Sequence, residues 1–201
     1  IRQLYETLKM INADSTLWVS DPTWPSHVGM AGHMGLKLAK YRYFDAVTST
    51  VNAAAMMEDI QDMQPGDVLL LHGCCHNPTG ANLGPDDWNA LTDFVLDRGV
   101  VPFIDIAYQG FGDGLAEDAA NLRMMAARVP EMLIAASCSK NFGLYRDRVG
   151  CAMAVCSSAD QHAVVSRNLA VLNRLNYSFA PDHGAAAVAI ILGDTALRAE
   201  W

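Results

Sequence analysis

The sequence predicts an α/β fold in which a mostly parallel sheet is covered by helices on both faces. Short apolar runs rich in β-forming residues alternate along the 201 residues with segments whose apolar positions recur at helical spacing. The short runs are apolar throughout, which is typical of strands that are buried on both faces of a sheet. No repeat, low-complexity stretch or linker interrupts the alternation, so we expect one domain over residues 1–201.

The expected strands are five apolar runs: Thr16–Ser20, Asp67–His72, Val100–Ile106, Met132–Ser137 and Cys151–Cys156. In open α/β sheets, ligands bind in the loops at the carboxyl ends of the strands. Unusual polar residues lie at the ends of the first four runs. These four strand ends therefore hold the candidate functional residues.

The clearest expected helix lies between Gly84 and Gly99. Pro85 suits the first helical position, and the carboxylates of Asp86 and Asp87 favour the positive end of the helix dipole. Gly99 can end the helix. Other helices are expected over Ile1–Met10, Ala53–Met63, Glu117–Arg128, Ala159–Arg174 and Asp182–Trp201.

Charge and cysteine usage exclude several classes of protein. Fourteen Lys and Arg residues against 22 Asp and Glu residues give a net charge of −8, which disfavours a broad nucleic-acid or anionic-membrane surface. No apolar run reaches the roughly 18 residues of a membrane-spanning helix. Five cysteines are an odd number and suit reduced thiols better than a disulfide framework. We expect a soluble, cytoplasmic protein with no nucleic-acid or membrane partner.

One carboxylate, that of Asp105, lies at the end of an otherwise apolar run. Burial of an unpaired carboxylate is strongly unfavourable, and no Lys or Arg lies near Asp105 in the sequence. Either a distant side chain or the cation of a ligand must therefore pair with this residue, unless it only caps a loop.

Lys140 follows the run Met132–Ser137 at another strand end. Partial desolvation lowers the pKa of a lysine amine and makes it available as a nucleophile or base. Ser137, Ser139 and Arg148 lie close to it in the sequence and are donors that a phosphate or carboxylate needs. The segment indicates a reactive amine beside an anion site, although a lone lysine in this position is more often simply solvated.

The segment His72–Gly80 leaves a third strand in a tight turn. Its Asn-Pro and Thr-Gly pairs favour the turn and hold the amide of Asn77 over the sheet edge. The histidines and adjacent cysteines of the segment are possible metal ligands, but their spacing is not that of zinc motifs. We therefore expect no metal site.

The fourth strand end carries the segment Val19–His27, in which Pro22 and Pro25 stiffen the chain around Trp24. The indole can present a flat face to an aromatic ring, although tryptophans more often pack in a core or at its rim. Each segment is a modest signal by itself. Their joint occurrence predicts a ligand site.

Three segments closely resemble the signature sequences of fold-type I pyridoxal-phosphate aminotransferases of the aspartate and aromatic branch. They are His72–Gly80 (HGCCHNPTG), Asp105–Phe111 (DIAYQGF) and Ser137–Gly150 (SCSKNFGLYRDRVG), and their order and approximate spacing also match. The resemblance extends over essentially the whole chain. It implies a three-layer α/β/α domain with a mostly parallel mixed sheet, the large cofactor-binding domain of that family, and pyridoxal 5'-phosphate as cofactor.

The resemblance also implies roles at the cofactor. Lys140 matches the lysine that bonds covalently to the cofactor, and Asp105 matches the carboxylate that pairs with its pyridine nitrogen. Further contacts are implied for Asn77 and Tyr108 at the phenolic oxygen, for Ser137 and Arg148 at the phosphate, and for Trp24 against the pyridine face.

Other positions match residues farther from the cofactor. His27 and His72 resemble groups that hold the orientation of Asp105. Arg174 matches an arginine that reaches across a dimer interface to the distal carboxylate of a substrate, so a homodimer is expected. Trp24 and Asn77 are also expected at the substrate. These matches imply transfer of an amino group from an amino acid to a 2-oxo acid.

The residues around Arg174 look closer to tyrosine and aromatic aminotransferases than to strict aspartate enzymes, so we expect aromatic substrates with a dicarboxylic co-substrate such as 2-oxoglutarate. Aspartate transamination is the alternative, and a non-catalytic relative is a remote one. A serine acyltransferase is disfavoured, because the S-x-x-K of Ser137–Lys140 lacks an accompanying K-T-G or S-D-N motif. The family's glycine-rich phosphate loop, α-carboxylate arginine and small domain are expected outside residues 1–201, so we expect the 201-residue chain alone to be inactive.

Overall fold

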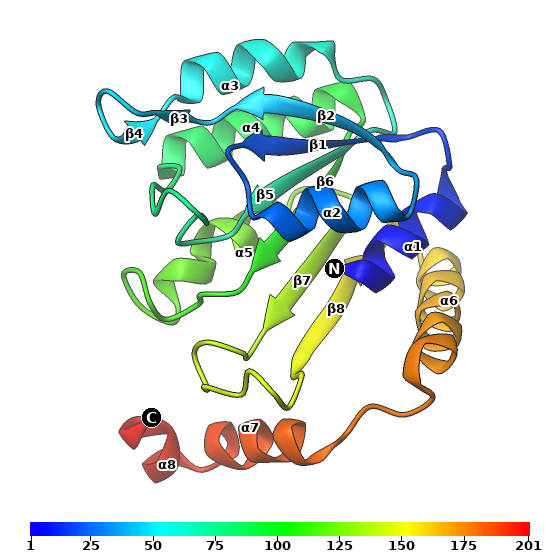
Figure 1. The fold of residues 1–201 in the computed structure, drawn as a ribbon, viewed down its shortest axis with the longest axis vertical. Coiled ribbons are helices and arrows are strands. Elements are labelled where there is room, and N and C mark those ends of the chain that lie inside the picture. The colour runs from blue at the N-terminus through cyan, green and yellow to red at the C-terminus, as the bar shows by residue number, and fades with distance from the viewer.

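The computed structural model describes all residues 1–201 and contains a six-stranded sheet between two layers of helices (Figure 1). The order of the strands across this sheet is β2-β1-β5-β6-β7-β8. All neighbouring strands are parallel except β7 and β8, which pair in antiparallel orientation. The predicted three-layer fold with a mostly parallel mixed sheet is confirmed.

The predicted strands begin and end within one residue of the observed ones: β1 (Thr16–Asp21), β5 (Val68–His72), β6 (Val101–Ile106), β7 (Met132–Ser137) and β8 (Gly150–Val155). Three other strands have no counterpart in the prediction. They are the edge strand β2 (Lys37–Arg42) and the short antiparallel pair of β3 (Phe44–Asp45) and β4 (Thr50–Val51). β2 is missed because its residues are mostly exposed and half of them are basic, so they form no continuous apolar run.

The helices are α1 (Arg2–Ile11), α2 (Pro25–His33), α3 (Ala53–Asp59), α4 (Pro85–Arg98), α5 (Ala120–Ala126), α6 (Ala159–Tyr177), α7 (His183–Gly193) and α8 (Thr195–Glu200). The prediction for α4 is confirmed, and Gly99 ends this helix with a φ of 69°. Pro25 does not belong to a stiff loop as predicted, because it occupies the first turn of α2. None of the helices combines the length and the apolar character needed to cross a membrane.

The prediction of a single helix over Asp182–Trp201 is wrong, because the helical conformation is interrupted between α7 and α8. Asp194 has an extended backbone conformation, and its side chain accepts hydrogen bonds from the backbone N–H groups of Ala196 and Leu197. An aspartate that caps the next helix in this way competes with continuation of the preceding one.

Each face of the sheet has its own apolar core. One core packs α3, α4 and α5 against the sheet and contains Trp88 and Met125, whereas the other packs α1 and α2 against the opposite face and contains Leu4 and Phe103. Figure 1 shows these helices on the two sides of the sheet, with α7 and α8 apart from it. Because both faces are covered, the ends of the strands are the places where polar side chains can gather.

Candidate active site

A cavity of about 510 Å³ opens at the carboxyl ends of β5, β6 and β7. The residues that line it come from five segments that are distant in the sequence, and four of these meet because parallel strands end at the same edge of the sheet. Of the ten residues predicted at the site, eight line this cavity: Trp24, His72, Asn77, Asp105, Tyr108, Ser137, Lys140 and Arg148.

Asp105 is the buried carboxylate of the cavity, with 8% of its surface exposed. The register of the sheet places it between His72 on β5 and Ala135 on β7. The Nε2 atom of His27 lies 2.9 Å from its Oδ2 atom. No hydrogen bond within the chain reaches its Oδ1 atom. One oxygen is thus held by a distant side chain, and the other is available to a cation in the cavity.

A directed hydrogen-bond chain supports Asp105. The backbone N–H of Asn77 donates to His72 Nδ1 at 3.3 Å, which places the proton of a neutral His72 on Nε2. That nitrogen lies 3.3 Å from the Thr23 hydroxyl, which in turn lies 2.9 Å from His27 Nδ1. In this arrangement Thr23 donates to His27, and the Nε2–H of His27 donates to Asp105. The chain therefore fixes both the position and the tautomer of the ring that holds the carboxylate.

His76 is a buried residue next to the site, and the sequence prediction considers it only as a metal ligand. Its Nε2 lies 2.9 Å from the Ser20 hydroxyl, and its Nδ1 lies 2.9 Å from the Thr79 hydroxyl. Its ring stacks on Tyr43 at 4.0 Å and lies 4.2 Å from the ring of His72. Burial, together with neighbouring imidazoles, lowers the pKa of His76 to about 4 and that of His72 to about 2. Both rings are therefore neutral at physiological pH.

Thr23 is also absent from the sequence prediction. It stands four residues before His27 and lies between Pro22 and Pro25. A hydroxyl and an imidazole at this spacing are a local signal that could have suggested the contact. For His76, the flanking Thr79 is such a signal, whereas Ser20 lies too far away in the sequence to be found.

Lys140 and Tyr108 lie next to each other in the wall of the cavity. The Nζ atom of Lys140 lies 4.8 Å from the centre of the Tyr108 ring. The Tyr108 hydroxyl accepts a hydrogen bond from Asn77 Nδ2 at 3.5 Å. An amine, a phenol and an amide are thus gathered around one volume, into which Asp105 also opens.

Hydroxyl and guanidinium groups form the other part of the cavity. The Ser137 hydroxyl, at the end of β7, accepts from the backbone N–H of Ser139 at 3.1 Å and lies 3.0 Å from the Ser139 hydroxyl. Arg148 has a φ of 57°, and its guanidinium donates to the backbone carbonyl of Tyr145. The other N–H groups of this guanidinium remain available to an anion.

Two predicted site residues do not line the cavity. His27 is fully buried beside Asp105, and its ring is nearly perpendicular to the Trp24 ring, with 5.2 Å between the ring centres. Arg174 lies on α6, is exposed, and has its guanidinium 5.0 Å from the centre of the Phe179 ring. The structure of one chain therefore does not bring Arg174 to the other site residues.

The model of the family "Aminotransferase class I and II" matches residues 1–201. The chain belongs to this family. An aromatic-amino-acid aminotransferase from Paracoccus denitrificans is 52% identical over 201 residues, which are 100% of this chain and 51% of that protein. An aspartate aminotransferase from Escherichia coli is 44% identical over 186 residues, 92% of this chain and 47% of that protein.

Solved aminotransferase structures have the same fold. An aromatic-amino-acid aminotransferase from Burkholderia pseudomallei, described as covalently bound to pyridoxal phosphate, has a TM-score of 0.96 at 39% identity and covers 100% of this chain and 50% of that one. The chain spans about half the length of the curated relatives it matches.

Pyridoxal phosphate is the cofactor of this aminotransferase family, and the residues of the cavity fit it. The open Oδ1 of buried Asp105 suits a protonated ring nitrogen, since a buried anion stabilises a nearby cation. The amine of Lys140 suits a cofactor aldehyde. Ser137 and Arg148 offer the hydroxyl and bidentate guanidinium donors that a phosphate binds.

Proposed function

We propose that residues 1–201 form the cofactor-binding domain of a pyridoxal-phosphate-dependent aminotransferase. Its reaction is transfer of an amino group from an aromatic amino acid to a dicarboxylic 2-oxo acid such as 2-oxoglutarate. One observation carries the proposal: the half-buried amine of Lys140 and the open oxygen of buried Asp105 line the same cavity. The bound cofactor supplies an electron sink that stabilises a negative charge at the substrate Cα.

Asp105, held by His27, stabilises a positive charge on the ring nitrogen of the cofactor. The carboxylate keeps a ring nitrogen protonated, because loss of that proton would leave Asp105 buried and without a cation on its Oδ1 side. His27 donates to the other oxygen and prevents the carboxylate from rotating away. Asn77 and Tyr108, which are hydrogen-bonded to each other, would bind the phenolic oxygen of the cofactor and stabilise its anionic form.

Lys140 is the proposed catalytic residue. Its amine would hold the cofactor covalently. When not bonded to the cofactor, the amine would lie within the cavity, where it could accept a proton from the substrate Cα and return it to another carbon. Ser137 and Arg148 bind the phosphate, and a bidentate arginine fixes its orientation in a way that a lysine cannot.

The aromatic preference has two supports. The aromatic-amino-acid enzyme of Paracoccus denitrificans is more similar to this chain than the aspartate enzyme of Escherichia coli is, at 52% against 44% identity. The sequence around Arg174 also resembles the aromatic enzymes. The exposed position of Arg174 supports a homodimer in which it reaches the partner's cavity, and five free cysteines support a reducing, cytoplasmic location.

Substitution of Lys140 in the full-length, cofactor-loaded protein tests the proposal. Lys140→Ala should abolish the visible absorption of the lysine-bonded cofactor and lower kcat by about 10³-fold or more, because the amine is both the attachment point and the proton carrier. Lys37→Ala, which changes an exposed lysine paired with Asp14, is the matched control and should keep both properties.

Two results would contradict the proposal. Unchanged absorption and activity in Lys140→Ala would exclude this lysine as the reactive amine, and absence of both from the unaltered full-length protein would indicate a non-catalytic relative. The substrate assignment is checked separately by kcat/KM for tyrosine, phenylalanine and aspartate. A large preference for aspartate would replace the aromatic assignment with the aspartate one.

A further inference from the structure

Two adjacent thiols and a carboxylate meet beside the active-site cavity. The Sγ atoms of Cys74 and Cys75 and a carboxylate oxygen of Asp118 all lie within 4.8 Å of one another. Cys74 and Cys75 follow β5, whereas Asp118 belongs to the 3₁₀ turn Glu117–Ala119 that precedes α5. None of the three has a role in the proposed transamination.

The carboxylate of Asp118 is already oriented and ionised. Its Oδ2 atom accepts from the backbone N–H groups of Gly110 at 2.7 Å and Gly112 at 3.0 Å, and its Oδ1 atom accepts from Asp113 at 2.9 Å. Although burial opposes ionisation, these donors hold the pKa of Asp118 below its ordinary value. Carboxylates that bind metals are commonly held by such hydrogen bonds, and Oδ1 keeps a second lone pair for a ligand bond.

The spacing of the donor atoms suits one small ion. Zinc–sulfur bonds are about 2.3 Å long, so two sulfurs on one tetrahedral zinc ion lie about 3.8 Å apart. The donor atoms of Cys74, Cys75 and Asp118, all within 4.8 Å of one another, are close to this spacing. Three protein ligands leave a fourth tetrahedral position for water.

The chemistry of the donors selects the kind of ion. Two of the three donors are thiols, which lose their protons when a cation binds to their sulfurs. Ions that prefer oxygen ligands, such as Mg²⁺, gain little from sulfur, whereas thiophilic ions form strong bonds to thiolates. A soft or borderline divalent cation is therefore the ligand that this donor set fits.

We propose that Cys74, Cys75 and Asp118 form a binding site for a thiophilic divalent cation, for which Zn²⁺ and Cd²⁺ are the probes. On binding, each thiol releases one proton to the solvent and forms one sulfur–metal bond, and no electron is transferred. The sequence spacing argues against a zinc site made of the two cysteines with His72 and His76. It does not concern a site in which Asp118 is the third ligand. Both histidines are bonded elsewhere, and the third donor comes from a distant segment.

The test is a metal titration of the reduced, cofactor-loaded full-length protein after removal of metals. Cd²⁺ binding is followed by thiolate-to-cadmium charge-transfer absorption, and Zn²⁺ affinity by competition with a chromophoric chelator. Cys74→Ser and Cys75→Ser should each weaken binding at least tenfold, and Asp118→Asn several-fold. Cys156→Ser, which removes a free thiol elsewhere in the chain, is the matched control and should leave the affinity unchanged.

Binding that persists at full affinity in the Cys74→Ser, Cys75→Ser double variant would overturn the proposal. An equal loss in Cys156→Ser would indicate unspecific thiol binding and would also overturn it. If Asp118→Asn fails to fold, as circular dichroism would reveal, the metal affinity of Cys75→Ser is the deciding measurement. Cys75 is half-buried, and its replacement leaves the turn around Asp118 intact. The titration does not depend on transaminase activity, so its result is separable from that of the Lys140 experiment.

Discussion

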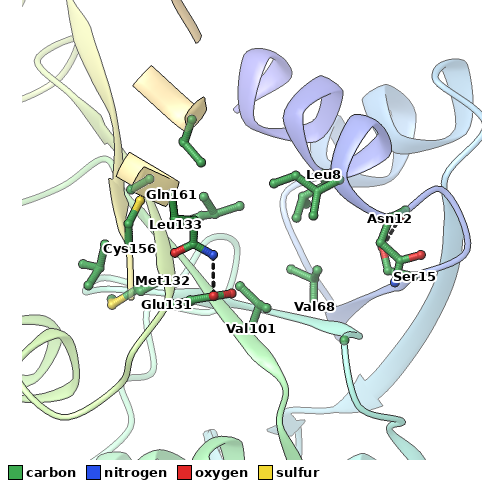
Figure 2. Close-up of a pocket in the computed structure, with 15 residues that line it drawn as sticks. Leu8, Asn12, Ser15, Val68, Val101, Glu131, Met132, Leu133, Cys156 and Gln161 are labelled. Atoms are coloured by element: carbon green, nitrogen blue, oxygen red, sulfur yellow. Dashed lines mark hydrogen bonds between the residues drawn. The ribbon is translucent and has the colours of Figure 1, made fainter. Parts of the chain in front are cut away.

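The two ends of the central sheet hold cavities of opposite character. At the carboxyl ends of the strands, charged and hydrogen-bonding groups line a volume of about 510 Å³. At the amino ends, a cavity of about 200 Å³ beside α1 and α6 is lined mainly by apolar side chains such as Leu8, Val68 and Leu133 (Figure 2). Among its polar residues, Gln161 donates a side-chain hydrogen bond to Glu131, which is drawn as a dashed line in Figure 2.

The same strands line both cavities. β7 contributes Leu133 to the apolar cavity and Ser137 to the polar one, and β5 contributes Val68 and His72 in the same way. A hollow is therefore not by itself a functional site. Chemistry is located where buried strands end in polar residues that other segments hold in place, as Thr23 and His27 hold Asp105.

Removal of Asp105 from the polar end should have the largest effect on activity. In the full-length protein, Asp105→Ala should lower kcat/KM by about 10²–10³-fold, because it removes a preorganised charge from a buried site. Asp93→Ala, which removes an exposed carboxylate paired with Arg128, should change it less than about twofold. Steady-state kinetics with tyrosine and 2-oxoglutarate measure both effects. Equal activity of the two variants would show that the buried carboxylate is not used.

A substitution at the apolar end should affect stability and leave the chemistry intact. Leu133→Ala should lower the free energy of unfolding by about 2–4 kcal/mol, because it enlarges a cavity in the core beneath α1. Val47→Ala, at a side chain that is 95% exposed, should change it by less than about 0.5 kcal/mol. Urea denaturation gives both values. A loss of kcat in Leu133→Ala without a loss of stability would contradict the prediction that the apolar end contributes to stability and not to catalysis.

The neutral histidines predict a pH effect that is confined to the polar end. The pKa of His76 is about 4 in the folded protein against an ordinary value of 6.5, so between these values the unfolded chain binds more protons. Stability should therefore fall as the pH decreases from about 6.5 through 4, and His72 adds an effect of the same sign that extends to lower pH. Between its folded and unfolded pKa values, each histidine lowers the free energy of unfolding by about 1.4 kcal/mol for each unit of decrease in pH.

His76→Gln should reduce this slope by up to one proton's contribution. Urea midpoints measured between pH 7 and pH 4 provide the comparison with the unaltered protein. His162→Gln changes a histidine on α6, away from the polar cavity, and should leave the slope unchanged. Parallel stability curves for all three proteins would show that burial of His76 does not govern its protonation.

The sequence by itself predicted most of the fold and most of the candidate site. Strands such as β7 and the helix α4 were predictable because continuous apolar runs, helical periodicity and capping residues are local signals. Lys140, Asp105 and Asn77 were predictable because each lies in a contiguous motif at a strand end. Edge strand β2 and helix α2 were not, since neither has a continuous apolar run or a strong periodic pattern.

The tertiary structure alone decided which groups are partners. It placed Thr23 between two histidines, His76 between the hydroxyls of Ser20 and Thr79, and Asp118 beside the adjacent cysteines. The contacts of Thr23 with His72, of His76 with Ser20 and of Asp118 with the cysteines join residues that are distant in the chain and follow no repeating pattern. The physical reason is that strand register and loop packing determine side-chain partners, whereas composition and periodicity determine only whether a segment is buried and in which conformation.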